Sequence, residues 1–123
     1  MGTEIVKTRF TEIPAYITKD GSLIRELMHP NLHACHNQSL AEAEIPPGSL
    51  TRLHRHVHTE ELYHILTGNG LMHLGDERFA VESGDTVCIR PGTPHQIRNT
   101  GETSLKILCC CCPPYSHEDT QLL

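Results

Sequence analysis

Two segments of this sequence gather side chains that are suited to bind a metal ion. In the first, His54 and His56 are separated by one residue, and Glu61 follows. Imidazole and carboxylate groups are common ligands of divalent transition metals. Residues two apart on a β-strand lie on the same face, so both imidazoles can reach one ion. The chain must turn before Glu61, and we expect a hairpin at His58 and Thr59 to bring Glu61 back beside the two imidazoles.

The second segment supplies a third imidazole, His95. It follows the run from Arg90 to Pro94, which contains two prolines and one glycine. Such a loop has few accessible backbone conformations, so it holds a ligand in place and lowers the entropic cost of metal binding. His58 shares strand parity with His54 and His56 and is therefore the alternative to them as a ligand.

Short β-strands are the elements expected to position these residues. From about residue 38 onward, short apolar runs are closed by turn residues, as at Gly75-Asp76-Glu77 and Ser83-Gly84-Asp85. No segment between residues 40 and 112 has a sustained helical period. Many short strands at regular spacing are typical of a β-sandwich or barrel.

Four consecutive cysteines, Cys109 to Cys112, end the last expected strand. Neighbouring residues on a strand point to opposite faces, so these thiols are poorly placed to pair with one another. We expect this strand to span residues 105–112, and the inward-facing residues to be Leu105, Ile107, Cys109 and Cys111. The inward thiols are expected to fill narrow space in the core. The alternative is that Cys109 or Cys111 faces the metal and is redox-active.

The two ligand-bearing segments resemble the two signature motifs of the cupin superfamily. The first motif is Gly, five residues, His-x-His, four residues, Glu, six residues and Gly; it falls on Gly48, His54, His56, Glu61 and Gly68. The second is Gly, five residues, Pro-x-Gly, two residues, His, three residues and Asn; it falls on Gly84, Gly92, His95 and Asn99. Arg90 stands where this motif has its first proline, and Pro91 beside it is expected to keep the loop rigid. The resemblance covers residues 40–112.

This resemblance implies an all-β fold, a jelly-roll barrel of six to eight strands with a metal near one end of its interior. Family members bind Mn, Fe, Ni, Zn, Co or Cu, so one divalent ion is implied, with the ligands His54, His56, Glu61 and His95. An octahedral ion with four protein ligands keeps two positions for water or substrate, which is the arrangement a catalyst needs.

The expected organisation has three parts: an N-terminal extension (1–36), the barrel core (37–112) and a C-terminal tail (113–123) that folds back as a loop. Small cupins often exchange N-terminal strands or pair sheet faces, which covers edges that would otherwise invite aggregation. We therefore expect a homodimer in which residues 3–18 contribute to the contact between subunits.

Four further side chains are candidates for roles around the metal. Arg52 shares parity with the two histidines of the first segment and is a candidate to bind an anionic group of a substrate, unless it lies at the barrel rim. Tyr63 shares parity with Glu61 and is either a hydrogen-bond donor near the metal or a core aromatic. Tyr115 and His117 are candidates to cap the cavity and supply an acid or base, with a solvated tail as the alternative.

Composition excludes several classes of function. The net charge is −5 and the ten basic residues are scattered, which argues against a nucleic-acid-binding surface. No apolar run approaches the roughly 20 residues of a membrane span, and the N-terminus does not resemble a signal peptide. We expect a cytoplasmic protein with reduced thiols. A second metal site at His29, His33, Cys35 and His36 lacks a known ligand spacing, and we expect these residues to be ordinary surface.

Three functions agree with these features. The first is an enzyme like the phosphomannose isomerases, in which the metal polarises a small polar substrate and a side chain moves a proton. The second is a dioxygenase or a decarboxylase of a small acid. The third is a module without catalytic activity that binds a small ligand through the metal.

Overall fold

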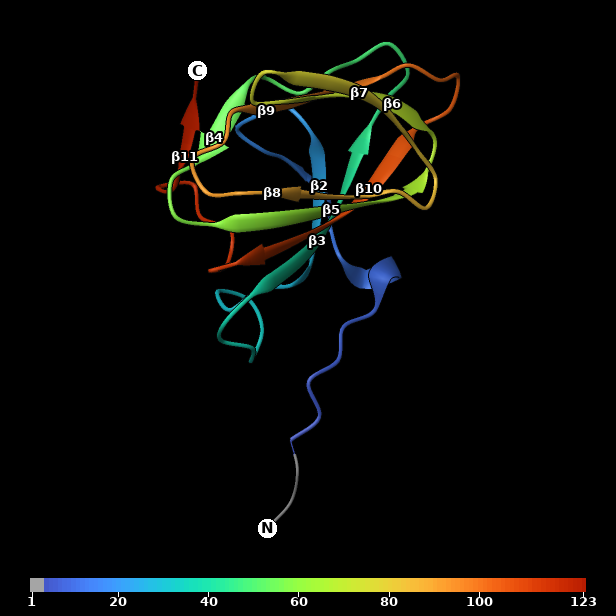
Figure 1. The fold of residues 1–123 in the computed structure, drawn as a ribbon. Helices are drawn as coiled ribbons and strands as arrows, with labels where there is room; N and C mark the ends of the chain where they lie inside the picture. Colours follow the sequence, from blue (N-terminus) through green and yellow to red (C-terminus); the bar gives the residue numbers. More distant parts are fainter. Residues whose placement is uncertain (1–3) are drawn as a thin grey trace.

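Short β-strands are the main regular elements of the computed structural model, which describes residues 4–123 (Figure 1). One 3-10 turn, η1 (Phe10–Glu12), precedes eleven strands: β1 (Tyr16–Ile17), β2 (Leu23–Met28), β3 (Ser39–Ile45), β4 (His54–His56), β5 (Glu60–Thr67), β6 (Asn69–Leu74), β7 (Glu77–Glu82), β8 (Thr86–Ile89), β9 (His95–Asn99), β10 (Leu105–Cys112) and β11 (Thr120–Leu122). The all-β prediction is confirmed. Within residues 4–123, no helix has the length and apolar character needed to cross a membrane.

The strands form two antiparallel sheets that face each other across a shared interior (Figure 1). One sheet has the strand order β1-β2-β3-β10-β5-β8, and the other has the order β11-β4-β9-β6-β7. Strands that are distant in sequence are neighbours in both sheets, as β3 and β10 are. This arrangement is the jelly roll that the sequence predicted.

Buried and exposed side chains alternate along the strands, and the buried ones form the core between the sheets. In β10 the inward residues Leu105, Ile107, Cys109 and Cys111 are buried, as predicted. The opposing sheet contributes Met72 and Ile97, which are almost fully buried. All six cysteines are free thiols, which agrees with the prediction that they do not pair with one another.

Two local predictions were wrong. The residues between β4 and β5 do not form a hairpin, because β4 and β5 belong to opposite sheets. Glu61 therefore reaches the histidines from across the interior. The C-terminal tail is not only a loop, because its last residues form β11, which pairs with β4 through Thr120 opposite His56 and Leu122 opposite His54.

The N-terminal segment has two parts. β2 pairs along β3 and extends the larger sheet, and β1 pairs with β2. Residues before η1 run away from the two sheets (Figure 1), although the Thr8 hydroxyl donates a hydrogen bond to the carbonyl of Leu27. Residue 3, which begins the segment expected to contact a partner subunit, lies outside the described residues.

Candidate metal centre

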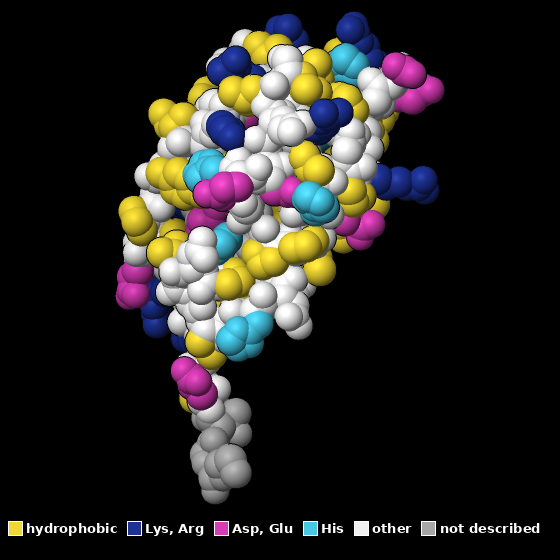
Figure 2. Space-filling view, turned by 90° about the vertical axis from the view of Figure 1, so that its left-hand side faces the viewer, with side chains coloured by type: hydrophobic (Ala, Val, Ile, Leu, Met, Phe, Trp, Pro, Cys, Tyr) yellow, Lys and Arg dark blue, Asp and Glu magenta, His cyan; other side chains and the backbone are white. Residues whose placement is uncertain are grey.

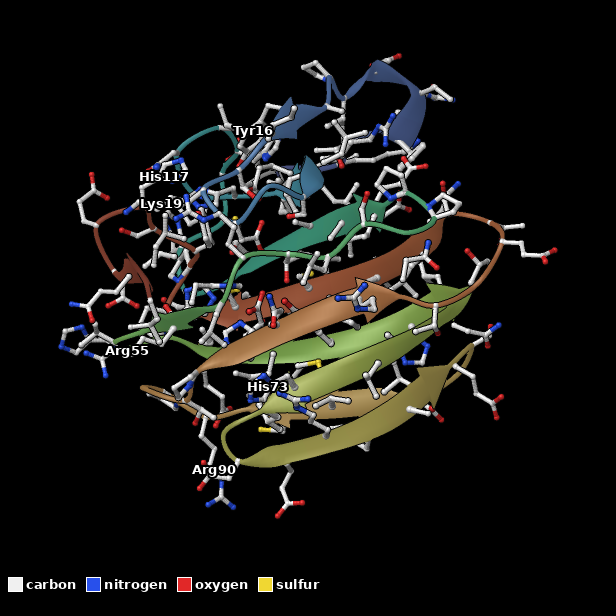
Figure 3. The ribbon with its side chains drawn as sticks, turned by 90° about the horizontal axis from the view of Figure 1, so that it is seen from above. Tyr16, Lys19, Arg55, His73, Arg90 and His117 are labelled. Carbon is white, nitrogen blue, oxygen red and sulfur yellow. The ribbon has the colours of Figure 1, made fainter. Side chains whose placement is uncertain are left out.

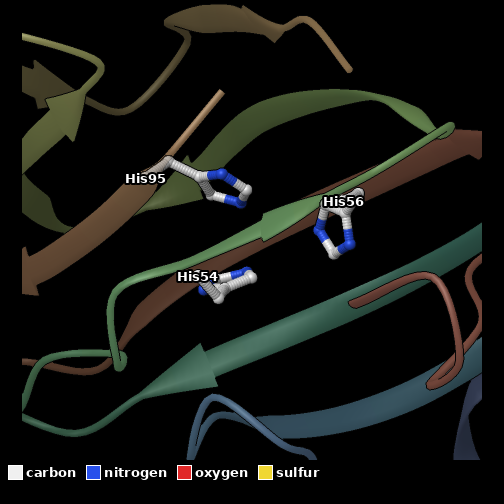
Figure 4. A group of neighbouring side chains, drawn as sticks. All are labelled: His54, His56 and His95. Atoms are coloured by element: carbon white, nitrogen blue, oxygen red, sulfur yellow. The ribbon is translucent and has the colours of Figure 1, made fainter. Parts of the chain in front are cut away.

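Three histidines meet at one end of the interior. β4 presents His54 and His56 on one face, and the antiparallel pairing of β4 with β9 places His95 directly opposite His54. One ring nitrogen of each lies within 4.8 Å of those of the other two, and all three side chains are buried. Figure 4 shows the rings converging from these two strands. The one-residue spacing thus placed both imidazoles of β4 on one face, as expected.

Hydrogen bonds fix which nitrogen of each ring carries its hydrogen. His54 Nδ1 is 2.8 Å from the carbonyl of Arg52, and His95 Nδ1 is 3.0 Å from the carbonyl of Thr93. A carbonyl only accepts, so both Nδ1 atoms donate. The Thr120 hydroxyl donates to the carbonyl of Ser116, so it accepts from His56 Nδ1 at 3.0 Å. Each neutral ring therefore directs the lone pair of Nε2 into the cluster.

Glu61 faces these lone pairs from β5. Its Oε1 is 3.1 Å from His56 Nε2 and 3.6 Å from His95 Nε2. His95 Nε2 is buried and has no hydrogen-bond partner among residues 4–123. Buried polar atoms are almost always satisfied. A metal cation between the three Nε2 atoms and the carboxylate would satisfy all of them, so this donor set fits a divalent ion.

Electrostatics keep these groups in the form that a metal requires. Burial lowers the pKa of His54, and the neighbouring His95 lowers it further, which favours the neutral ring. Burial alone would raise the pKa of Glu61, but in the metal-free protein imidazoles of His56 and His95 that carry a proton on Nε2 donate to the carboxylate, and their hydrogen bonds and charges lower its pKa to about 2. Metal ligands must be deprotonated, so both shifts favour metal binding.

Asp20 is a neighbour of the site that the sequence prediction missed. It lies in the loop between β1 and β2, and its Oδ2 is 3.6 Å from His54 Nε2. Its Oδ1 accepts hydrogen bonds from Thr18 and Ser22, which hold the loop over the cavity. An Asp-Gly pair in sequence indicates only a turn, so no motif marked this residue.

A cavity of about 40 Å³, enough for about three water molecules, lies beside the metal ligands. Tyr63 and Tyr115 line it, and their rings lie 6.0 Å from His95 and 5.9 Å from His56. Burial raises the pKa of Tyr63 well above its usual value and that of Tyr115 to about 12, so both remain neutral phenols.

The inward thiols also reach this region, as the alternative for the cysteine run expected. Cys109 and Cys111 line the cavity, and Cys111 Sγ donates to Glu61 Oε2 at 3.3 Å. Burial raises the pKa of both thiols, and the charge of Glu61 raises them further. A protonated thiol is a poor nucleophile, so this environment opposes redox reactivity.

Three of the residues considered for the site lie elsewhere. Arg52 precedes β4, where strand alternation no longer holds, and its side chain is exposed outside the cavity lining. His117 is also exposed at the rim, where its carbonyl accepts a hydrogen bond from Lys19 (Figure 3). His58, the rival ligand, is exposed and bonds through Nδ1 to Asp119 at 2.8 Å.

The other histidine-rich segment does not gather into a metal site among residues 4–123. His29 is buried and bonds through Nε2 to the carbonyl of Tyr115, and His33 Nδ1 accepts from the amide of His29. These two rings therefore support the loop and the tail. The expectation that this segment is ordinary surface is wrong for His29, which is buried.

Residues 41–111 match the family model described as a cupin domain. The match covers more than half of the chain, and the protein therefore belongs to the cupin family. MJ1618 of Methanocaldococcus jannaschii, described as uncharacterized, is 58% identical over 120 residues, which are 98% of this chain and 96% of that protein. The oxalate-binding protein of Thermotoga maritima is 38% identical over 77 residues, 61% of this chain and 64% of that protein.

Solved structures with the same fold have diverse ligands. A variant of the Bacillus subtilis oxalate decarboxylase superposes with a TM-score of 0.83 at 22% identity, and this chain spans 33% of its length. Streptomyces PAC13 with uridine superposes with a TM-score of 0.78 at 14% identity, covering 95% of this chain and 89% of that one. At these identities the likeness shows the fold alone, and the site must indicate the ligand.

Proposed function

We propose that this protein holds one divalent transition metal on His54, His56, His95 and Glu61 and binds a small oxygen-rich molecule beside it. The cluster of three buried imidazoles, two of which have Nε2 within 3.6 Å of the Glu61 carboxylate, supports this proposal above all. A bound ion of this class acts as a Lewis acid that polarises a coordinated oxygen. The identity of the ion, among Mn, Fe, Ni, Zn and Co, follows from availability as much as from these ligands.

The chemistry that we propose first is proton transfer on the polarised substrate, as in an isomerase. Tyr63 and Tyr115 reach the cavity as neutral phenols, which can donate a hydrogen bond or a proton. Many of the residues that line the cavity are buried, and electrostatic contacts are stronger where less water surrounds them. Arg52 and His117 have no part in this proposal, because their side chains are exposed outside the cavity.

Decarboxylation of a small acid is the second candidate. The Thermotoga maritima relative, at 38% identity, is named for binding oxalate. The same relative also supports a protein that binds its ligand without converting it. Release of carbon dioxide from oxalate by the metal-loaded protein would separate these candidates, and oxygen uptake would indicate a dioxygenase.

Metal analysis of the purified protein is the primary test of the site. We expect close to one equivalent of a divalent transition metal per chain. His56→Ala should lose most of this metal, because it removes one lone pair from the cluster. His58→Ala is the matched control and should retain the metal, because His58 is exposed and bonds to Asp119. Equal metal content in both variants would show that the ligands are assigned wrongly.

We also propose a cytoplasmic homodimer. Six free cysteines favour a reducing compartment. Ile5 and Ile17 of the N-terminal segment are 86% and 73% exposed, and apolar side chains at such exposure are suited to contact a second subunit.

A further inference from the structure

A buried carboxylate, Glu26, lines the cavity from β2 and takes no part in the metal site. Glu26 is only 6% exposed. The Tyr16 hydroxyl donates to Glu26 Oε1 at 2.7 Å. The second oxygen, Oε2, is buried without a hydrogen-bond partner among residues 4–123. Tyr16 is labelled in Figure 3 on the N-terminal side of the barrel.

Glu26 and Glu61 line the same cavity from two strands of the larger sheet. In the larger sheet, β3 and β10 separate β2 from β5, which corresponds to about 14 Å between these two strands. The register places Glu26 beside Ala41 and Glu61 beside Cys111, one inward position further along the sheet. A molecule that binds a metal on Glu61 and extends along this wall of the cavity would approach Glu26.

The charge of the cavity limits what this molecule can be. Asp20, Glu26 and Glu61 line the cavity, whereas its lining among residues 4–123 contains neither lysine nor arginine. A second carboxylate on the ligand would meet like charge at Glu26, and like charges at close range repel. A hydroxyl group would instead donate a hydrogen bond to the free Oε2, which is favourable because a buried acceptor otherwise stays unsatisfied.

We infer that Glu26 forms a second recognition site in this cavity, which binds a hydroxyl group of the substrate. The substrate class is then a small hydroxylated acid or sugar-like molecule that binds the metal through oxygens at one end and donates a hydrogen bond at the other. A dicarboxylate such as oxalate does not satisfy this site. This inference rests on the proposed metal site and specifies its ligand.

Three acids that differ at one end test the inference by isothermal titration calorimetry on the metal-loaded protein. Glycerate, lactate and tartronate share a 2-hydroxycarboxylate that chelates the metal, and they carry a hydroxymethyl, a methyl and a second carboxylate group at the other end. Erythronate extends the hydroxyl arm by one carbon. We expect glycerate or erythronate to bind about tenfold more tightly than lactate, and tartronate to bind most weakly.

Glu26→Gln and Glu42→Gln form a matched pair of variants. Glu42 is a buried glutamate of β3 with an unpartnered oxygen, but it does not line the cavity. In Glu26→Gln the preference for the hydroxyl arm should shrink and the affinity for tartronate should rise, whereas Glu42→Gln should match the wild type. Metal content and the thermal midpoint of each variant establish that it is folded and loaded. The comparison of the acids on the wild-type protein tests the inference even if a variant fails to fold.

Equal binding of all four acids, or tightest binding of tartronate, would overturn the inference while leaving the metal-held ligand in place. Unchanged preferences in Glu26→Gln would also overturn it. The absence of metal-dependent binding for every acid would overturn both the inference and the proposed function.

Discussion

The hydroxyl of Thr120, which is not itself a metal ligand, selects which ring nitrogen of His56 carries the hydrogen. It accepts from His56 Nδ1 while donating to the carbonyl of Ser116, which leaves His56 Nε2 free for metal. Thr120→Val keeps the shape of the side chain but removes this acceptor. We expect about a tenfold loss of metal affinity, measured by competition with a chromogenic chelator. Thr120→Ser retains the hydroxyl and should bind metal like the wild type; equal losses in both would contradict this role.

Glu61 makes the stability of the metal-free protein depend on acid. Its pKa is about 2 in the folded chain, below the ordinary value of 4.5. A lowered pKa means that the unfolded chain binds the proton more readily, so this stabilisation is present above pH 4.5 and is lost as the pH falls towards 2.

The contribution of Glu61 is about 3 kcal/mol when fully present. Urea denaturation of the metal-free protein between pH 5 and 2.5 should therefore show a fall in the free energy of unfolding. Glu61→Gln should flatten part of this dependence, because glutamine does not titrate. Parallel pH profiles for the two proteins would be the contrary result.

At the level of elements, the turn between β5 and β6 depends on Gly68. Its φ of +96° lies in the region that favours glycine, and a Cβ there would lie 3.0 Å from Leu105 Cα and from the Ser104 carbonyl oxygen. Gly68→Ala should therefore lower the free energy of unfolding by about 2–4 kcal/mol, measured by urea denaturation. Gly101→Ala is the control and should have little effect, because the nearest atom is 3.6 Å away. Similar losses in both variants would contradict this account.

Much of the barrel was predictable because its signals are local. Alternation in β10 and the rigid loop before His95 are encoded within a few residues each. The relation between Glu61 and the histidines was predicted correctly, but through the wrong element. A strand pattern does not reveal which sheet a strand joins, so β4 and β5 were expected to pair rather than to face each other.

The missed neighbours of the site are products of long-range packing. Asp20 and Thr120 lie far from the ligand motifs in sequence, and they arrive on the β1–β2 loop and on β11. Cys111 was expected to face inward, but its hydrogen bond to Glu61 depends on the pairing of β10 with β5. Strand parity also failed for Arg52, because the strand begins only at His54.

For the whole molecule, we expect two copies of the chain to associate through the N-terminal segment. Figure 1 shows the described residues before η1 running away from the two sheets, and Figure 2 shows lysine and arginine side chains spread among acidic and apolar groups on one face of the molecule. Light scattering should give twice the chain mass of 13.8 kDa. Ile5→Asp should shift the protein towards monomer, because a charge would be buried at the contact between subunits.

Leu32→Asp changes a leucine that is 68% exposed outside the N-terminal segment, and it should leave the dimer intact. A monomeric mass for the wild type would rule out the dimer. Dissociation by Leu32→Asp but not by Ile5→Asp would place the contact elsewhere on the barrel.

The pairing of β11 with β4 has a consequence for the order of events during synthesis. All four candidate ligands have been translated by residue 95, but Thr120, which lies on the strand that pairs with β4, is translated only later. Until it emerges, the ring of His56 has no partner that selects its tautomer, and β4 lacks one neighbouring strand. Metal loading should therefore follow the emergence of Thr120, and a released chain truncated after residue 112 should bind the ion poorly although it contains every ligand.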